Sequence, residues 1–174
     1  MKIEVDLSSF EAGMGALMAG FQARVEKGVS DAALQVERAA KENLKEDARG
    51  KHLLSSIHTQ VASEGARVTA KVGVGGATDI EGARVTAKVG VGGATDIEYI
   101  EYDAAMNFGI YVHEGTGIYS RSGMGRKKVP WFYVDLKGEG HTTSGMQPNP
   151  FLENAYNSEG GRVAQIVTDA IMGG

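Results

Sequence analysis

The sequence predicts an α+β domain in which helices cover one face of a small antiparallel β-sheet. Three observations predict this fold class: an amphipathic helical pattern over residues 8–47, strand-like runs and long glycine-rich loops over residues 53–136, and a second helical pattern over residues 149–172. The length of 174 residues suits a single domain, 1–174, and the 42% hydrophobic content excludes wholesale disorder.

Composition excludes several classes of function. The chain has no cysteine, which excludes disulfides, thiolate nucleophiles and cysteine-ligated zinc. Its net charge of −4 disfavours a globally basic nucleic-acid binder. No apolar run approaches the ~18 residues of a membrane span, and the first residues lack an apolar signal core. We therefore expect no membrane contact and synthesis in a cytoplasm.

The first helical pattern is too long for a domain of this size. One apolar stripe runs along it at spacings of three and four, through Phe10, Met14, Leu17, Met18, Phe21 and Val25. A continuous helix from residue 10 to 45 would measure ~54 Å. We expect either a kink near Gly28 or packing of part of the stripe on another subunit.

An internal repeat spans the middle of the chain. Residues 64–80 read EGARVTAKVGVGGATDI, and residues 81–97 repeat them without a change. Two identical copies without a third favour a recent tandem duplication, or an artefact, over a functional array. Each copy alternates apolar and polar residues, which predicts a strand. Because 17 is odd, the turn between the copies must reset the side-chain phase. We expect a protruding hairpin, or one strand plus a loose loop.

The remaining elements are shorter. Residues 53–62, 108–113 (FGIYVH) and 129–136 (VPWFYVDL) have the composition of strands. At the last helix, Asn149 is expected to cap the N-terminus and Pro150 to take the first helical position. The Gly160–Gly161 pair is expected to break or kink that helix.

A search for catalytic motifs finds little. There is no G-x-S-x-G elbow, no phosphate-binding loop and no H-E-x-x-H helix, and the four histidines lack metal-ligand spacing. We therefore expect no catalytic residue, no metal and no cofactor. His113 and Glu114 could form an acid–base pair, but a strand-end pair that faces a neighbouring element is the favoured interpretation.

One charged segment is distinctive. Residues 115–134 contain no acid and four basic residues: Arg121, Arg126, Lys127 and Lys128. Basic side chains on a glycine-rich loop can neutralise DNA phosphates or meet an acidic partner. A solvated loop with no ligand is the competing interpretation.

Three motifs appear in a fixed order: residues 111–117 (YVHEGTG), 130–133 (PWFY) and 145–152 (GMQPNPFL). The series resembles a family of tail-component morphogenesis proteins of long-tailed bacteriophages, described as minor tail, tail-completion or head–tail joining proteins. Residues 41–43 with Gly50 and Leu53 match more loosely, so the resemblance covers most of residues 30–172. The GMQPNPFL run is the most specific part. The exact repeat and residues 99–107 depart from the family pattern.

The resemblance implies a structural virion protein of the head–tail interface or upper tail, and no enzyme. Such a protein acts in virion assembly as a subunit of a homo-oligomeric, six-fold ring. Its expected partners are further copies of itself, other neck or tail proteins (tail tube, terminator, connector) and DNA in the channel. It is expected in the tail or neck of the virion, and in the host cytoplasm during assembly. The alternatives are a DNA-contacting accessory protein that uses loop 121–128, and a small hydrolase that uses His113 and Glu114.

Aromatic residues point to an interface near the motifs. Trp131 and Phe132, with Phe151 and Leu152 at the start of the last helical pattern, form a dense apolar cluster, and interfaces favour aromatic anchors within a polar rim. We expect the Gly-Thr-Gly loop to lie beside the start of the last helix. The predicted partner surface comprises Glu114, Gly115, Thr116, Gly117, Trp131, Phe132, Pro150 and Phe151.

Overall fold

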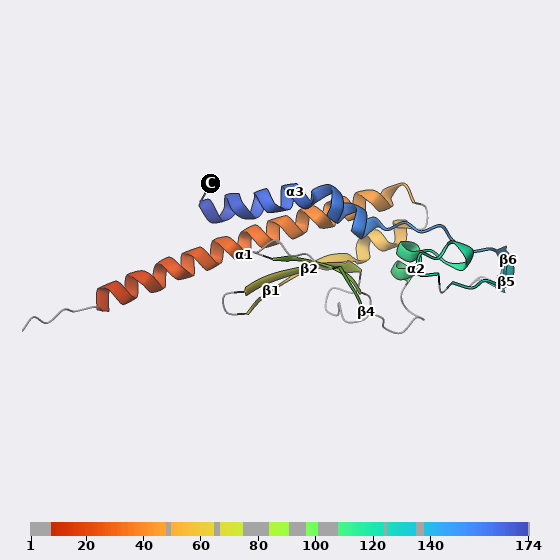
Figure 1. Ribbon diagram of the computed structural model, residues 1–174, viewed down its shortest axis with the longest axis horizontal. Helices are drawn as coiled ribbons and strands as arrows, with labels where there is room; N and C mark the ends of the chain where they lie inside the picture. Colours follow the sequence, from red (N-terminus) through yellow and green to blue (C-terminus); the bar gives the residue numbers. More distant parts are fainter. Residues whose placement is uncertain are drawn as a thin grey trace, which may run out of the picture.

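Helix α1 (Ser8–Lys45) is the element against which the rest of the molecule packs. The computed structural model describes residues 8–47, 50–64, 67–74, 84–90, 97–100, 108–123, 125–134 and 138–173. In Figure 1, α1 lies between the C-terminal helix α3 (Phe151–Met172) and a four-stranded antiparallel sheet. Both helices cover the same side of the sheet, so the predicted α+β class is confirmed.

The sheet and the connecting elements follow the chain order. The sheet has the order β1 (Ile57–Glu64), β2 (Arg67–Val74), β3 (Arg84–Gly90), β4 (Ile97–Ile100). A 3₁₀ segment, η1 (Gly50–Ser56), leads into β1. After the sheet come α2 (Phe108–Glu114) and η2 (Gly117–Tyr119), and then a separate two-stranded hairpin, β5 (Trp131–Val134) with β6 (Gly140–Thr143).

Helices α1 and α3 are antiparallel and packed closely. Asn43 near the end of α1 donates from Nδ2 to the carbonyl oxygen of Phe151, 3.0 Å away, at the start of α3. At the far end of the contact, a Cβ on Gly28 would lie only 2.8 Å from the Cβ of Ala170. The helix runs through Gly28 without interruption, so the expected kink is absent and the glycine instead allows α3 to approach.

Small side chains allow α1 to pack between two layers. Apart from Gly28, its buried positions are mostly spaced by three and four residues and carry only Val and Ala until the last turn: Val25, Val29, Ala32, Ala33, Val36, Ala40 and Leu44. The same core holds Phe151, Leu152 and Ala155 of α3 and four side chains of β2: Val68, Ala70, Val72 and Val74. The alternation seen in the first copy of the repeat therefore marks a core-facing strand.

Both copies of the repeat form strands, β2 and β3, and they are antiparallel neighbours in one sheet. The register pairs Ala70 with Val89 and Val72 with Ala87, so apolar positions of the two copies meet. The reversal of direction resets the phase, as the odd repeat length requires. The expected hairpin of the two copies is present, but β2 also pairs with β1 and β3 with β4, so the pair lies within the four-stranded sheet and not as a separate protrusion. The alternative of one strand plus a loose loop is excluded for these residues.

One predicted strand is a helix, and another begins later than expected. Residues 108–113 form most of α2, and residues 53–56 belong to η1, so the strand that was expected over 53–62 begins only at Ile57. Short apolar runs do not distinguish a strand from a buried helical turn. In α2, Val112 and His113 are buried while Tyr111 is exposed, because one face of a single short helix packs inward.

The start of α3 also differs from expectation. Pro150 occupies the N-cap position and no side chain caps the helix. Asn149 instead donates from Nδ2 to Asp47 Oδ2 at 3.2 Å and to the carbonyl oxygen of Asn43 at 3.3 Å, which ties the start of α3 to the end of α1. The helix also continues through Gly160 and Gly161 without a break.

Candidate functional site

The motifs that were singled out in the sequence meet in space. The main chain of Thr116, just after α2, exchanges two hydrogen bonds with Met146: Thr116 N to Met146 O at 2.9 Å and Met146 N to Thr116 O at 3.2 Å. The amide of Ile118 donates to the carbonyl of Ser144 at 3.2 Å. We call this pairing of residues 114–118 with residues 144–149 the motif junction. The expectation that the Gly-Thr-Gly loop lies beside the start of the last helix is therefore confirmed.

Glycine is required where the two segments of the motif junction touch. Gly117 has φ +63°, and a Cβ there would overlap the carbonyl oxygen of Ser144. Gly145 has φ +123°, and a Cβ there would overlap the carbonyl oxygen of Thr116. A side chain at either position would push the two segments of the motif junction apart. The glycines of both motifs therefore allow the same contact.

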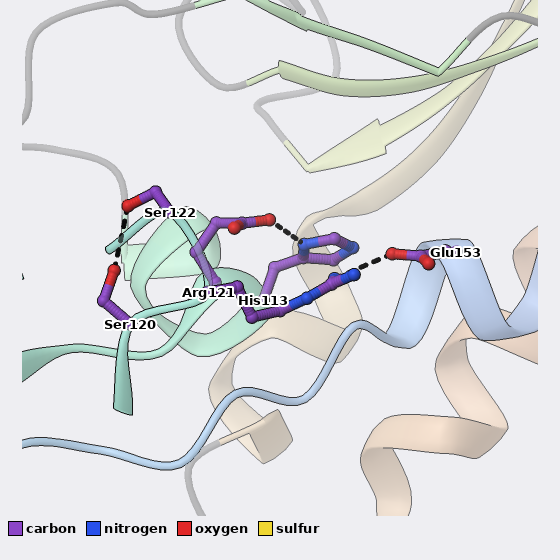
Figure 2. A network of polar contacts seen from close by, with 6 residues as sticks. His113, Ser120, Arg121, Ser122 and Glu153 are labelled. Carbon is purple, nitrogen blue, oxygen red and sulfur yellow. Dashed lines mark hydrogen bonds and ion pairs between the residues drawn. The ribbon is translucent and has the colours of Figure 1, made fainter. Parts of the chain in front are cut away.

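A network of polar contacts lies beside the motif junction and links it to α3 (Figure 2). His113 Nδ1 lies 2.9 Å from Glu114 Oε1, and Arg121 Nη1 donates to Glu153 Oε2 at 2.7 Å. The amide of Arg121 also donates to the carbonyl of Glu114 at 2.9 Å. The His113 ring meets Phe151 edge-on, with centroids 5.5 Å apart. These contacts join α2, the following loop and the first turn of α3.

The network shifts two pKa values. Burial lowers the pKa of His113, and the neighbouring Glu114 carboxylate opposes that effect only in part. The hydrogen bond from Arg121 lowers the pKa of Glu153. At neutral pH, His113 is therefore an uncharged ring whose Nδ1–H donates to Glu114.

This arrangement does not favour the hydrolase alternative. The His113 side chain is 0% exposed, whereas a general base must come within about 3 Å of a substrate proton. Its ring also packs on Phe151 of the core. The geometry is that of a buried structural pair.

Beyond the motif junction, large apolar side chains lie exposed on one end of the molecule. They come from η2 and β5: Ile118, Tyr119, Phe132, Tyr133 and Val134. Phe132 is 66% exposed, and its ring lies over Gly140 of β6, where a Cβ would come within 2.6 Å. Tyr133 stacks on His141 with centroids 5.2 Å apart. We call these five residues the hairpin patch.

The predicted partner surface is only partly at the surface. Phe132 is exposed and Trp131 is half-buried. Phe151 is fully buried in the core, as is Leu152, so the expected four-residue cluster is divided between the core and the hairpin. Phe151 cannot contact a partner in this conformation, because its side chain is fully buried and its ring packs against the His113 ring of α2.

The other residues of that surface lie within the motif junction. Gly115 and Gly117 are buried, while Glu114, Thr116 and Pro150 are half-buried. These residues shape the base of the hairpin patch and offer little surface of their own.

The four basic residues do not act alike. Arg121 is held by Glu153, and the guanidinium of Arg126 lies 5.5 Å from the centre of the Trp131 ring, a cation–π contact. Lys127 and Lys128 are exposed and lie shortly before β5, from which Val129 and Pro130 separate them. A phosphate or an acidic partner would therefore meet the two lysines first.

A second exposed apolar surface lies at the opposite end of the molecule, on α1. Met14, Leu17, Met18 and Phe21 are all exposed, and Leu17 is 66% exposed. We call these four residues the helix patch. These four residues were not among the predicted interface residues. The excess length of the apolar stripe is the sequence feature that could have indicated them.

Comparison with known proteins returns no relative. No family model, no curated protein and no solved structure matches the chain. Within the described ranges, no helix has the length and apolar character to span a bilayer. In the same part of the chain, no three His, Asp or Glu side chains gather as metal ligands would.

Proposed function

We propose that the chain is a structural protein of the head–tail interface or upper tail of a long-tailed bacteriophage. It acts in virion assembly as a subunit of a homo-oligomeric ring, in the host cytoplasm and then in the tail or neck of the particle. It makes contacts with further copies and with neck or tail proteins, and it breaks no bond.

The observation that carries this proposal is the motif junction. The resemblance to phage tail-completion proteins rests on separate runs of sequence, and two of these runs are hydrogen-bonded to one another through Thr116 and Met146. Gly117 and Gly145 are needed for that contact, because a Cβ at either position would overlap a carbonyl oxygen of the other run. The runs thus act as one structural unit, which places η2 and the β5–β6 hairpin at the end of the molecule (Figure 1).

Exposed surface supports a role in assembly. Among the described residues, thirteen large apolar side chains are exposed, and nine of them lie in the two patches, four in the helix patch and five in the hairpin patch. Contiguous apolar surface on a single chain indicates contact with other macromolecules. Tail tube, terminator or connector proteins are the partners that the resemblance implies.

DNA is a secondary partner in this proposal, through Lys127 and Lys128 where the ring surrounds the channel. Phosphate contacts of this kind weaken steeply as the salt concentration rises. Duplex binding by the assembled protein that is independent of salt, or unchanged in the Lys127→Ala, Lys128→Ala double variant, would contradict this part.

Deletion of the gene from the phage genome that carries it tests the proposed function. We expect infected cells to accumulate filled heads and separate or aberrant tails, visible by electron microscopy, and a plasmid copy of the wild-type gene to restore joined particles. Normal particle yield without the gene would overturn the proposal. A plasmid copy with Leu34→Glu, an exposed substitution outside both patches, is the matched control and should also restore the yield.

A further inference from the structure

His113 lies at the contact between α2 and the first turn of α3. Its Nδ1 atom lies 2.9 Å from Oε1 of Glu114, and its ring packs edge-on against Phe151. The side chain is 0% exposed. Figure 2 shows the ring beside the Arg121–Glu153 ion pair, which joins the loop after α2 to α3. The titratable ring is therefore enclosed by the elements that it joins.

The part of the chain that carries His113 contributes little to the hydrophobic core. We call residues 108–123, 125–134 and 138–149 the α2 segment. Among the buried apolar core residues that the structure describes, Val112 alone comes from the α2 segment, and Met146 packs against them partly buried. The others come from α1, η1, β1, β2 and α3. Because segments that bury few apolar side chains open at a lower free energy than the core, the core can stay packed while the α2 segment opens.

The charges around the His113 ring come from each element packed against it. Within the described residues they are Glu114 of α2, Arg121 of the following loop and Glu153 of α3. Burial and the Arg121 guanidinium lower the pKa of His113, and the two carboxylates offset this effect only in part. An imidazolium withdrawn from water loses its hydration. A proton therefore binds more tightly to the ring when the ring is in water than when it is in this site.

We propose that protonation of His113 opens the contact between the α2 segment and the core formed by α1, α3 and the sheet. Since Nδ1 already carries a hydrogen, the added proton goes to Nε2, and the charged ring leaves its site beside Phe151 for water. The Arg121–Glu153 pair separates at the same time, which costs little because both side chains are partly exposed. The hairpin patch belongs to the α2 segment, so opening frees that patch from a fixed position on the core. The inference concerns this chain alone and does not depend on the proposed function.

The direction of the pH response follows from proton binding in the two states. In the open segment the pKa of the His113 ring returns to about 6.5, whereas in the closed segment it is lower. The open state therefore binds more protons, and the open population rises as the pH falls below about 6.5. Each pKa unit between the two states contributes up to a tenfold change in the opening equilibrium.

Thiol labelling at two buried valines tests the proposal, because the chain has no cysteine of its own. Val112→Cys reports on α2, and Val36→Cys reports on α1 from a valine that is equally buried. Each labelling rate is divided by the rate of the same variant in concentrated urea at the same pH, which removes the titration of the thiol itself. Circular dichroism melts should show that both variants are folded.

The two probes distinguish opening of the α2 segment from unfolding of the whole chain. At pH 7.5, the relative labelling rate of Val112→Cys should be at least tenfold higher than that of Val36→Cys. Low urea concentrations should accelerate only Val36→Cys, since local opening exposes little surface. From pH 7.5 to pH 5.0, the relative rate of Val112→Cys should rise about tenfold. Equal rates with the same urea dependence, or a rate of Val112→Cys that does not change with pH, would overturn the proposal.

Removal of single histidines from the Val112→Cys variant identifies the group that responds to pH. His113→Asn should abolish the rise, and His141→Asn, in the same segment, should retain it. A rise that persists in His113→Asn, or that is lost in His141→Asn, would overturn the proposal. If His113→Asn does not fold, an NMR titration of the His113 ring in the wild-type chain is the second measurement. Its midpoint should lie below about 6.5, and a midpoint at or above that value would contradict the proposal.

Discussion

Two glycines in or near the motif junction have the same backbone conformation but different surroundings. Gly117 combines a left-handed backbone with direct contact to the carbonyl of Ser144, while Gly123 has a similar φ of +68° and open space around it. The two positions differ only in what a side chain would meet. They therefore separate backbone strain from steric overlap.

Substitution of each glycine by alanine should show that difference. Gly123→Ala should lower the free energy of unfolding by about 1 kcal/mol, the cost of the left-handed conformation. Gly117→Ala should lower it by at least about 3 kcal/mol, because the junction must also open. Urea unfolding followed by circular dichroism measures both. Equal losses would mean that the junction is not tightly packed in solution.

His113 makes stability depend on pH. In the unfolded chain its pKa is about 6.5, and burial lowers it in the folded chain. Between those two values the unfolded state binds more protons, so stability falls as pH falls. The stabilising effect of the neutral ring is complete only above the unfolded pKa.

The free energy of unfolding should therefore decrease from pH 7.5 to pH 5.5. His113→Asn keeps a donor near the Nδ1 position but cannot titrate, so its decrease over this range should be smaller. His141→Asn, on the half-exposed hairpin, is the matched control for loss of one histidine. An unchanged slope in His113→Asn would show that another group causes the pH dependence.

At the scale of elements, the repeat raises the question of whether both copies are needed for folding. The first copy forms β2, with four side chains in the core, and the second forms β3, which pairs with β2 and β4. Removal of residues 81–97 gives the same sequence as removal of residues 64–80, so one core-facing copy always remains.

The shortened chain should fold cooperatively with a melting temperature within roughly 8 °C of wild type, which corresponds to a loss of about 2 kcal/mol. The remaining copy can pair with β1, and loop-closure entropy changes little with length. Differential scanning calorimetry provides the measurement. A chain that no longer melts cooperatively would show that both copies belong to the core.

The elements also show what a sequence pattern can and cannot predict. Long periodic stretches predicted α1 and α3 within a few residues, because a stripe sustained over many turns fits only a helix. The prediction of a strand at residues 108–113 is wrong, since a largely apolar run of only six residues fits either structure. Asn149 was expected to cap α3, but the docking of α1 beside it supplies other partners, Asn43 and Asp47.

At the scale of the whole molecule, the oversized stripe is the prediction with the most consequence. The length of the stripe predicted a kink or an external contact, and α1 continues through Gly28 with residues 13–24 exposed. The interface residues were predicted less well. Phe151 was chosen for its aromatic ring, but burial depends on which elements pack around a residue, and neighbours distant in sequence decide that.

The molecule combines a packed core with an exposed apolar patch at each end. Helices α1 and α3 with the sheet form a core that can fold within one chain, while the helix patch and the hairpin patch remain for other surfaces. The proposed ring of several copies is the assembly that we expect to bring other surfaces to these two patches.

The native mass of the purified wild-type protein tests this account most directly. Native mass spectrometry at micromolar concentration should show one closed assembly of several copies, with six times 18.4 kDa as the value that the family resemblance predicts. A single species at 18.4 kDa, unchanged as the concentration is raised tenfold, would contradict the claim that this chain is a ring subunit.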